Sequence, residues 1–137
     1  MCFIIDEQGK KPRVRTVWKW VRLRADGYLC SPIRRTRQTW QPGAVMTAKP
    51  PYTDRCRGGP SWRSPLAENG IYVFLDYATA WYTARKWNLG LGNNTWVIIK
   101  CHVDPKDFLY RGKHRDVNTA TYKQVTVAEE QPYLSWY

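Results

Sequence analysis

Acidic residues are scarce in this chain, and long apolar runs are missing. The 137 residues include 11 Asp and Glu against 22 Lys and Arg, so the formal net charge is +11 at pH 7. No apolar run approaches the length of a membrane span. The apolar start of the chain is cut short by Asp6-Glu7, which does not fit an export signal. We therefore expect a cytoplasmic protein without membrane association, with its 4 cysteines reduced.

Motifs for metal and phosphate chemistry are missing as well. The chain has 2 histidines, and Cys101-His102 and His114 do not form a zinc-binding spacing. Gly90-Leu91-Gly92 is followed by two asparagines, which indicates the end of a helix rather than a phosphate loop. We predict no metal site and no cofactor, and we favour a binding protein over an enzyme.

Aromatic residues are abundant, with 8 Trp and 9 Tyr, and 43% of the residues are hydrophobic. That content excludes the disordered class, and the length suits one domain covering residues 1–137. We expect residues 1–15 to form a basic arm and residues 49–66 to form a long loop rich in Pro and Gly. The oligomeric state is left open.

Apolar and polar residues alternate at 16–24, which is typical of a half-buried strand, and the apolar run Val97-Ile98-Ile99 lies at the centre of the strongest strand candidate. We predict strands at 16–24, 70–75, 95–103 and 121–127. Asp76 is an expected N-cap for a helix at about 77–88, with Tyr77, Trp81 and Ala84 on one face. The predicted class is α+β, a mostly antiparallel twisted sheet with one main helix.

Positive charge is concentrated in the first half of the chain. Residues 1–63 hold 14 Lys and Arg against 4 Asp and Glu, and Asp26 is the one acidic residue between Lys10 and Arg37. Such a cluster opposes compaction unless a partner neutralises it, so we predict a polyanion partner. A solubilising face is the alternative.

Tryptophan and arginine alternate on the strand predicted at 16–24. Cations that take phosphates and rings that stack on bases suit single-stranded or distorted nucleic acid, although the same face would also suit an acidic protein. Alternatively, the tryptophans are core residues and the Arg stems reach outward. The residues expected to contact the polyanion are Lys10, Lys11, Arg13, Arg15, Trp18, Lys19, Trp20, Arg22, Arg24, Arg34, Arg35, Arg37 and Trp40.

The strand Gly70-Ile71-Tyr72-Val73-Phe74 and the following segment with Ala78, Ala80 and Tyr82 resemble part of a known fold. They are similar to the strand and helix that line the nicotinamide pocket in the poly(ADP-ribose) polymerase branch of the ADP-ribosyltransferase fold. The resemblance covers residues 68–137. It implies that fold, NAD as a cofactor and a site formed by Tyr72, Tyr82 and Arg22.

In that family the catalytic Glu would fall near positions 122–124, which hold no carboxylate here. The resemblance therefore implies an enzyme scaffold without a secure active site, since a fold does not fix a function. An ADP-ribosyltransferase-like enzyme that uses NAD to modify a host protein is the alternative function.

The overall layout resembles small uncharacterised proteins of bacteriophages and mobile elements. The chain starts Met-Cys with apolar residues, followed by a basic strand, the turn Ser31-Pro32 and a Gly-X-aromatic strand. This resemblance implies an anti-defence protein in the host cytoplasm that binds nucleic acid or a nucleoprotein, such as a CRISPR immune complex. A small structural component of the virion is a second alternative.

Overall fold

The structure is a computed structural model. It describes residues 5–6, 9–23, 29–30, 39–50, 53–55, 65–67, 70–86, 95–112 and 118–131.

One large sheet dominates the fold, and the described strand pairs are all antiparallel. Its main path runs in the order β1-β9-β10-β7-β2-β8-β11-β4, and β3 pairs separately with β2. Together with the one α-helix found in the described residues, this confirms the predicted α+β class. The strands are β1 (Ile5–Asp6), β2 (Thr16–Leu23), β3 (Leu29–Cys30), β4 (Val45–Thr47), β7 (Ile71–Phe74), β8 (Thr95–His102), β9 (Phe108–Gly112), β10 (Thr119–Tyr122) and β11 (Gln124–Val127).

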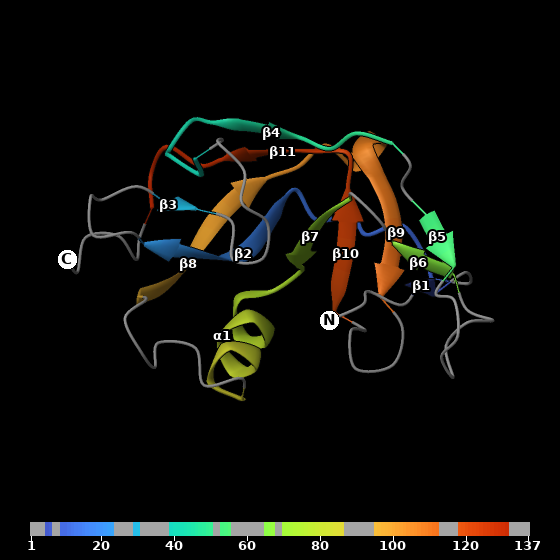
Figure 1. Cartoon of the computed structure of the whole chain (residues 1–137), viewed down its shortest axis with the longest axis horizontal. Helices are drawn as coiled ribbons and strands as arrows, with labels where there is room; N and C mark the ends of the chain where they lie inside the picture. The colour runs from blue at the N-terminus through green and yellow to red at the C-terminus, as the bar shows by residue number, and fades with distance from the viewer. Residues whose placement is uncertain are drawn as a thin grey trace.

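The sheet curls back on itself. In the pairing order, β10 and β11 are separated by β7, β2 and β8, yet in the sequence only Lys123 lies between them. Consecutive Cα atoms are about 3.8 Å apart, so the two ends of this five-strand path must meet. Figure 1 shows β11 and β4 folded over the strands β2 and β8. The inner face of the curl is thereby enclosed.

The inner face holds the core. Val17 and Val21 of β2 are fully buried, and their pairing partners Cys101 and Val97 on β8 are buried beside them. Val125 and Val127 complete the same cluster from β11. These residues alternate with more exposed ones along each strand, which is the pattern expected where one face of a strand is more deeply buried than the other.

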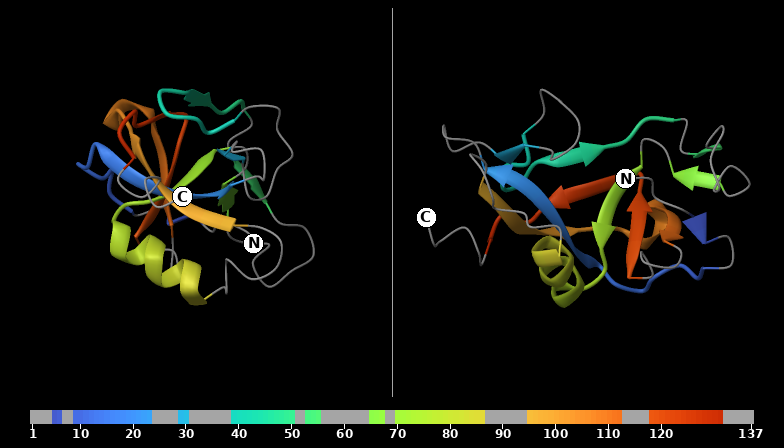
Figure 2. Two further views of the ribbon diagram at one scale, coloured as in Figure 1. Left: turned by 90° about the vertical axis from the view of Figure 1, so that its left-hand side faces the viewer. Right: turned by 60° about the horizontal axis from the view of Figure 1, so that its bottom comes forward.

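A second apolar layer covers the outer face of β2 and β7, where helix α1 (Tyr77–Lys86) packs. The helix begins after Asp76, whose carboxylate accepts hydrogen bonds from the Thr79 backbone N (2.7 Å) and from its hydroxyl (2.8 Å). This confirms the predicted N-cap. Figures 1 and 2 show α1 and β4 on opposite sides of the curled sheet.

The expected orientation of the helix needs a correction. Ala80 is its buried residue, whereas Trp81 keeps 45% of its surface exposed. Successive residues are about 100° apart around a helix, so a face centred on Tyr77, Ala80 and Ala84 leaves Trp81 at its margin. The spacing of Tyr77, Trp81 and Ala84 therefore predicted the correct side of the helix but the wrong centre.

Two further segments differ from the expected pattern. The strand predicted at 121–127 is two strands, β10 and β11, that pair with different neighbours on either side of Lys123. Within the expected loop at 49–66, β5 (Thr53–Arg55) begins a small antiparallel sheet with β6 (Pro65–Ala67). In the part of the chain that the structure describes, no helix is both long and apolar enough to cross a membrane.

Candidate functional site

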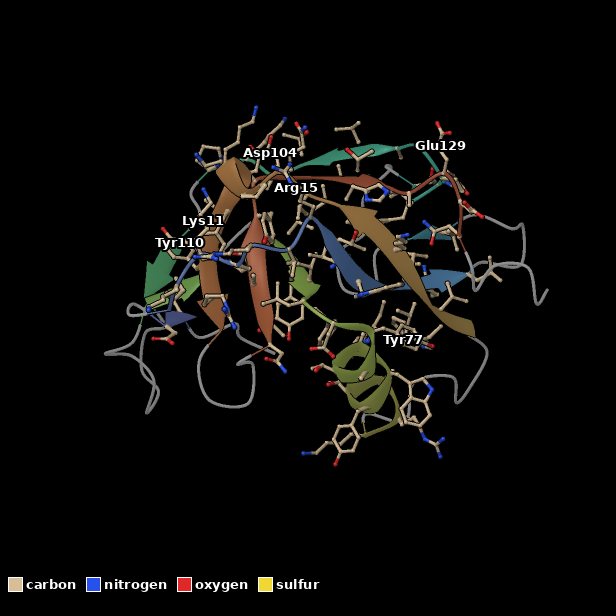
Figure 3. The ribbon with its side chains drawn as sticks, turned by 180° about the vertical axis from the view of Figure 1, so that it is seen from behind. Lys11, Arg15, Tyr77, Asp104, Tyr110 and Glu129 are labelled. Carbon is tan, nitrogen blue, oxygen red and sulfur yellow. The ribbon has the colours of Figure 1, made fainter. Side chains whose placement is uncertain are left out.

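The described part of the predicted arm exposes a row of cations. Residues 9–15 run as a stretched segment from β1 towards β2, and Pro12 is the buried residue among them. Figure 3 shows this segment crossing β9 and β10, with Lys11 near Tyr110 and Arg15 near Asp104. The cations whose side chains are exposed here are Lys10, Lys11, Arg13 and Arg15.

The backbone of this segment is held at both ends. At its start, Gly9 N donates to Asp6 O (3.0 Å) and the Arg111 guanidinium donates to Lys10 O (3.4 Å). At its end, Val103 N donates to Arg15 O (2.9 Å). A Cβ on Gly9 would lie 2.5 Å from Arg111 Cβ, so the chain passes too close to β9 for any larger residue. The arm cations thus project from a fixed segment.

Asp104 is the carboxylate next to the arm. It lies just before the 3-10 helix η1 (Pro105–Asp107) and accepts a hydrogen bond from Lys106 N (3.0 Å). That backbone bond lowers the pKa of Asp104, and the charges of Lys106, Arg15 and Lys11 lower it further. The Lys106 ammonium lies 3.8 Å from the Asp104 carboxylate. Asp104 therefore partly offsets the positive potential at this end of the arm.

Trp18 and Trp20 do not form a surface for base stacking. Trp20 Nε1 donates to Ala80 O (2.9 Å), and its ring lies 4.9 Å from that of Phe74. The Trp18 ring packs edge-on against Tyr77 at 5.2 Å. Both rings are therefore occupied in the apolar layer between α1 and the sheet. The alternative interpretation, in which Trp18 and Trp20 are packed as core residues, fits the structure better than base stacking.

Trp40 is buried, and Lys19 is partly buried beside it. Trp40 is 4% exposed, so its ring cannot stack on a base. Lys19 lies on the inner face of β2, where Nζ donates to Tyr72 O (2.8 Å) and sits 5.2 Å from the centre of the Trp40 ring. Burial lowers the pKa of Lys19 to about 8, against a smaller opposing effect of Cys101. Neither residue belongs to a surface that meets a polyanion.

Of the remaining predicted cations, the structure describes Arg22, which lies at the opposite end of β2 from the arm. Arg22 is half-buried near the end of β2, where it pairs with Trp96 and Cys30. Its Nε is buried without a hydrogen-bond partner. Arg24, Arg34, Arg35 and Arg37 lie outside the described residues.

The residues implied by the ADP-ribosyltransferase resemblance lie on three different elements. Tyr72 is on β7, where its ring meets Phe74 edge-on at 5.3 Å, and Arg22 is on β2. Tyr82 is on α1 and keeps 65% of its surface exposed, so it does not line a pocket. Among the residues that the structure describes, Asp76 is the carboxylate nearest in sequence to Tyr72 and Tyr82, and it is engaged in capping α1. This arrangement gives no specific support to NAD chemistry.

Cysteine and histidine form no reactive centre in the described residues. No three His, Cys, Asp or Glu side chains gather there in a way that could hold a metal ion. Cys101 is a buried free thiol, and burial raises its pKa to about 12 despite the opposing charge of Lys19. A thiol of this kind is a poor nucleophile near neutral pH.

Two features of the surface were missed by the sequence reasoning. Asp104 modulates the arm, and the signal for its position was an Asp directly before Pro105, a typical start of a short helix. The outer side of α1 carries Trp81 stacked with Arg85, whose Cζ lies 4.7 Å from the ring centre. The signal for this pair was an aromatic residue four positions before a cation.

Comparison with known proteins identifies no relative, so the function of the site is inferred from its geometry. No family model, no curated protein and no solved structure matches the chain.

Proposed function

We propose that this protein binds nucleic acid, free or within a nucleoprotein complex, through the arm cations Lys10, Lys11, Arg13 and Arg15. The observation that carries this proposal is a set of exposed cations on a backbone that is hydrogen-bonded at both ends. Cations on a fixed segment lose less conformational entropy when they bind than cations on a free chain. The net charge of +11 supports the same type of partner.

Binding by the arm is electrostatic. Each phosphate that a Lys or Arg neutralises releases condensed counterions, which makes the affinity fall as salt rises. Because contacts to phosphates carry no sequence information, the arm is expected to bind many sequences with similar affinity. Asp104 weakens this attraction, since it lies close enough to Lys11 and Arg15 for their charges to lower its pKa.

The test is a salt titration with labelled single-stranded DNA, duplex DNA and RNA, followed by fluorescence anisotropy. Four phosphate contacts predict a loss of affinity on the order of 50- to 150-fold between about 50 and 200 mM salt. Changing Lys10, Lys11, Arg13 and Arg15 together to Gln should reduce the slope of log K against log salt by about 3 to 4.

Asp104→Asn is the matched control, and it is expected to change the affinity for nucleic acid in the opposite direction to the Gln substitutions. An Asn side chain still accepts the Lys106 N hydrogen bond, so η1 keeps its cap while the negative charge is removed. We expect this variant to bind nucleic acid more tightly than the unchanged protein. If none of the three nucleic acids binds at low salt, the proposal is wrong, and an acidic protein surface becomes the better candidate.

A further inference from the structure

Two consecutive residues of α1 expose aromatic rings to solvent. Trp81 keeps 45% of its surface exposed and Tyr82 keeps 65%. In the described parts of the chain the other exposed large apolar residues are Val14 and Val45, which are not aromatic. Rings of this size normally bury most of their surface, so an exposed adjacent pair indicates an interaction site.

Each ring is followed by a cation one helical turn later. Arg85 lies four residues after Trp81, and its guanidinium is stacked at 4.7 Å from the ring centre. Lys86 has the same spacing from Tyr82, which places it on the same side of the helix. We call these four residues, Trp81, Tyr82, Arg85 and Lys86, the α1 patch.

No acidic residue occurs anywhere in α1, from Tyr77 to Lys86. The α1 patch therefore combines flat rings with positive charge and no nearby helical carboxylate. A cationic ligand would be repelled, and an aliphatic ligand would not use the charges. The partner that fits both features is a planar ring joined to an anion, which describes a nucleotide.

The geometry favours unpaired nucleotides over a duplex. The Arg85 guanidinium lies over the Trp81 ring, and 45% of the Trp81 surface remains exposed. Bases in a duplex are already stacked on one another and present only their edges, whereas unpaired bases can be splayed onto aromatic or Arg surfaces. Arg85 and Lys86 would contact the phosphates beside the stacked bases.

We propose that the α1 patch is a base-stacking site for single-stranded nucleic acid, with Trp81 and Tyr82 as the stacking rings. This proposal rests on the proposed function, because the arm would supply most of the phosphate contacts. Figure 3 shows the arm and α1 together in the view from behind. The α1 patch thus supplies the stacking that Trp18, Trp20 and Trp40 cannot.

The test compares two oligonucleotides of equal length and charge, oligo(dT) and an abasic strand that keeps the sugar-phosphate backbone but lacks bases. Changing Trp81 and Tyr82 together to Ala should weaken oligo(dT) binding by on the order of tenfold or more. The same variant should bind the abasic strand as the unchanged protein does. The arm variant with four Gln residues should lose affinity for both strands.

Two controls separate stacking from general surface effects. Tyr82→Phe keeps a ring and should retain binding, and Val45→Ala removes exposed apolar surface on β4 and should change nothing. Circular dichroism of each variant verifies that α1 is intact.

The outcomes are distinct for the two proposals. Unchanged oligo(dT) binding by the double variant, or equal losses for oligo(dT) and the abasic strand, overturns the stacking site but leaves the arm proposal standing. Tighter binding of polyglutamate than of oligo(dT) to the unchanged protein overturns the site in favour of an acidic peptide partner. Failure of the unchanged protein to bind either oligonucleotide while it binds duplex DNA or RNA overturns the stacking site alone, and failure to bind any nucleic acid at low salt defeats the proposed function itself.

Discussion

Lys19 is a cation on the inner face of the sheet, between the buried residues Val17 and Val21. Among the described residues, β2 pairs with β7 at one position, Trp18 with Phe74, and then with β3 at Arg22 and Leu23. Lys19 lies where β2 has parted from β7, and its ammonium bonds to Tyr72 O there. The Lys19 side chain therefore connects β2 to β7 beyond the point where the backbone pairing of these two strands ends.

This placement predicts an unusual dependence of stability on pH. The pKa of Lys19 is lowered by burial from 10.5 to about 8. Below pH 8 the Lys19 side chain is protonated in both the folded and the unfolded protein. The folded protein then bears the full cost of the buried charge, about 3 kcal/mol. Between pH 8 and 10.5 the unfolded chain binds more protons than the folded one, so the contribution of Lys19 to stability rises with pH. We expect the stability of the unchanged protein, relative to Lys19→Met, to increase across that window.

Urea unfolding of both proteins from pH 7 to 10.5 measures this difference. Subtracting the variant matters, because the raised pKa values of Cys101 and Tyr122, both about 12, make stability fall at high pH in both proteins. Parallel stability curves for the two proteins would contradict the prediction. In an extended strand, Val17, Lys19 and Val21 share one side, but this spacing does not reveal that the side is enclosed.

At the scale of elements, α1 is short and depends on its first turn. A helix of 10 residues is marginal by itself in water, so its cap and its packing on β2 and β7 must hold it. The Asp76 carboxylate provides two hydrogen bonds to Thr79, one to the backbone and one to the hydroxyl.

Asp76→Ala removes both of these bonds and leaves the Thr79 N–H without its cap. We expect the free energy of unfolding to fall by about 1 kcal/mol, as is typical for the loss of an N-cap. Chemical denaturation followed by circular dichroism measures this change. Asp76→Asn, which preserves an acceptor, should cost less, and equal losses for the two variants would indicate that charge rather than capping is responsible.

The main elements could be predicted because their signals are local. The alternation around Val17 and Val21 identified β2, and the apolar run Val97-Ile98-Ile99 identified β8. The site was less predictable, because alternation shows that Trp18 and Trp20 share a face but not that α1 covers it. The pairing of β5 with β6 was hidden for a similar reason, since it joins segments separated by several breaker residues.

At the scale of the whole molecule, charge opposes folding. With 22 Lys and Arg against 11 Asp and Glu, bringing the cations together costs free energy that the extended chain avoids. Added salt screens this repulsion more in the compact state than in the unfolded one.

Raising sodium chloride from about 20 to 300 mM should therefore increase the melting temperature by a few degrees, equivalent to about 1 kcal/mol. Differential scanning calorimetry measures the shift. The arm variant with four Gln residues should show a smaller increase, because four of the repelling charges are gone. A melting temperature that falls with salt would show that attractive ion pairs outweigh the repulsion.

The curled shape of the sheet was beyond the reach of sequence reasoning. From Thr121 to Val127 the apolar positions shift from even to odd numbers between Tyr122 and Val125, and this shift is the one local mark of the place where the chain changes neighbours. The change depends on β7, β2 and β8, which are distant in sequence and fix where β10 must end.

The single-residue connection at Lys123 also constrains how this protein can evolve. Inserting or deleting one residue there would move Val125 and Val127 to the opposite face of β11 and bring Thr126 into the core. Substitutions in β10 and β11 are compatible with the fold when the new side chain has a similar size and polarity. A change in the number of residues between Tyr122 and Val125 is not. In any descendant that keeps this fold, gaps in a sequence alignment should fall outside positions 119–127.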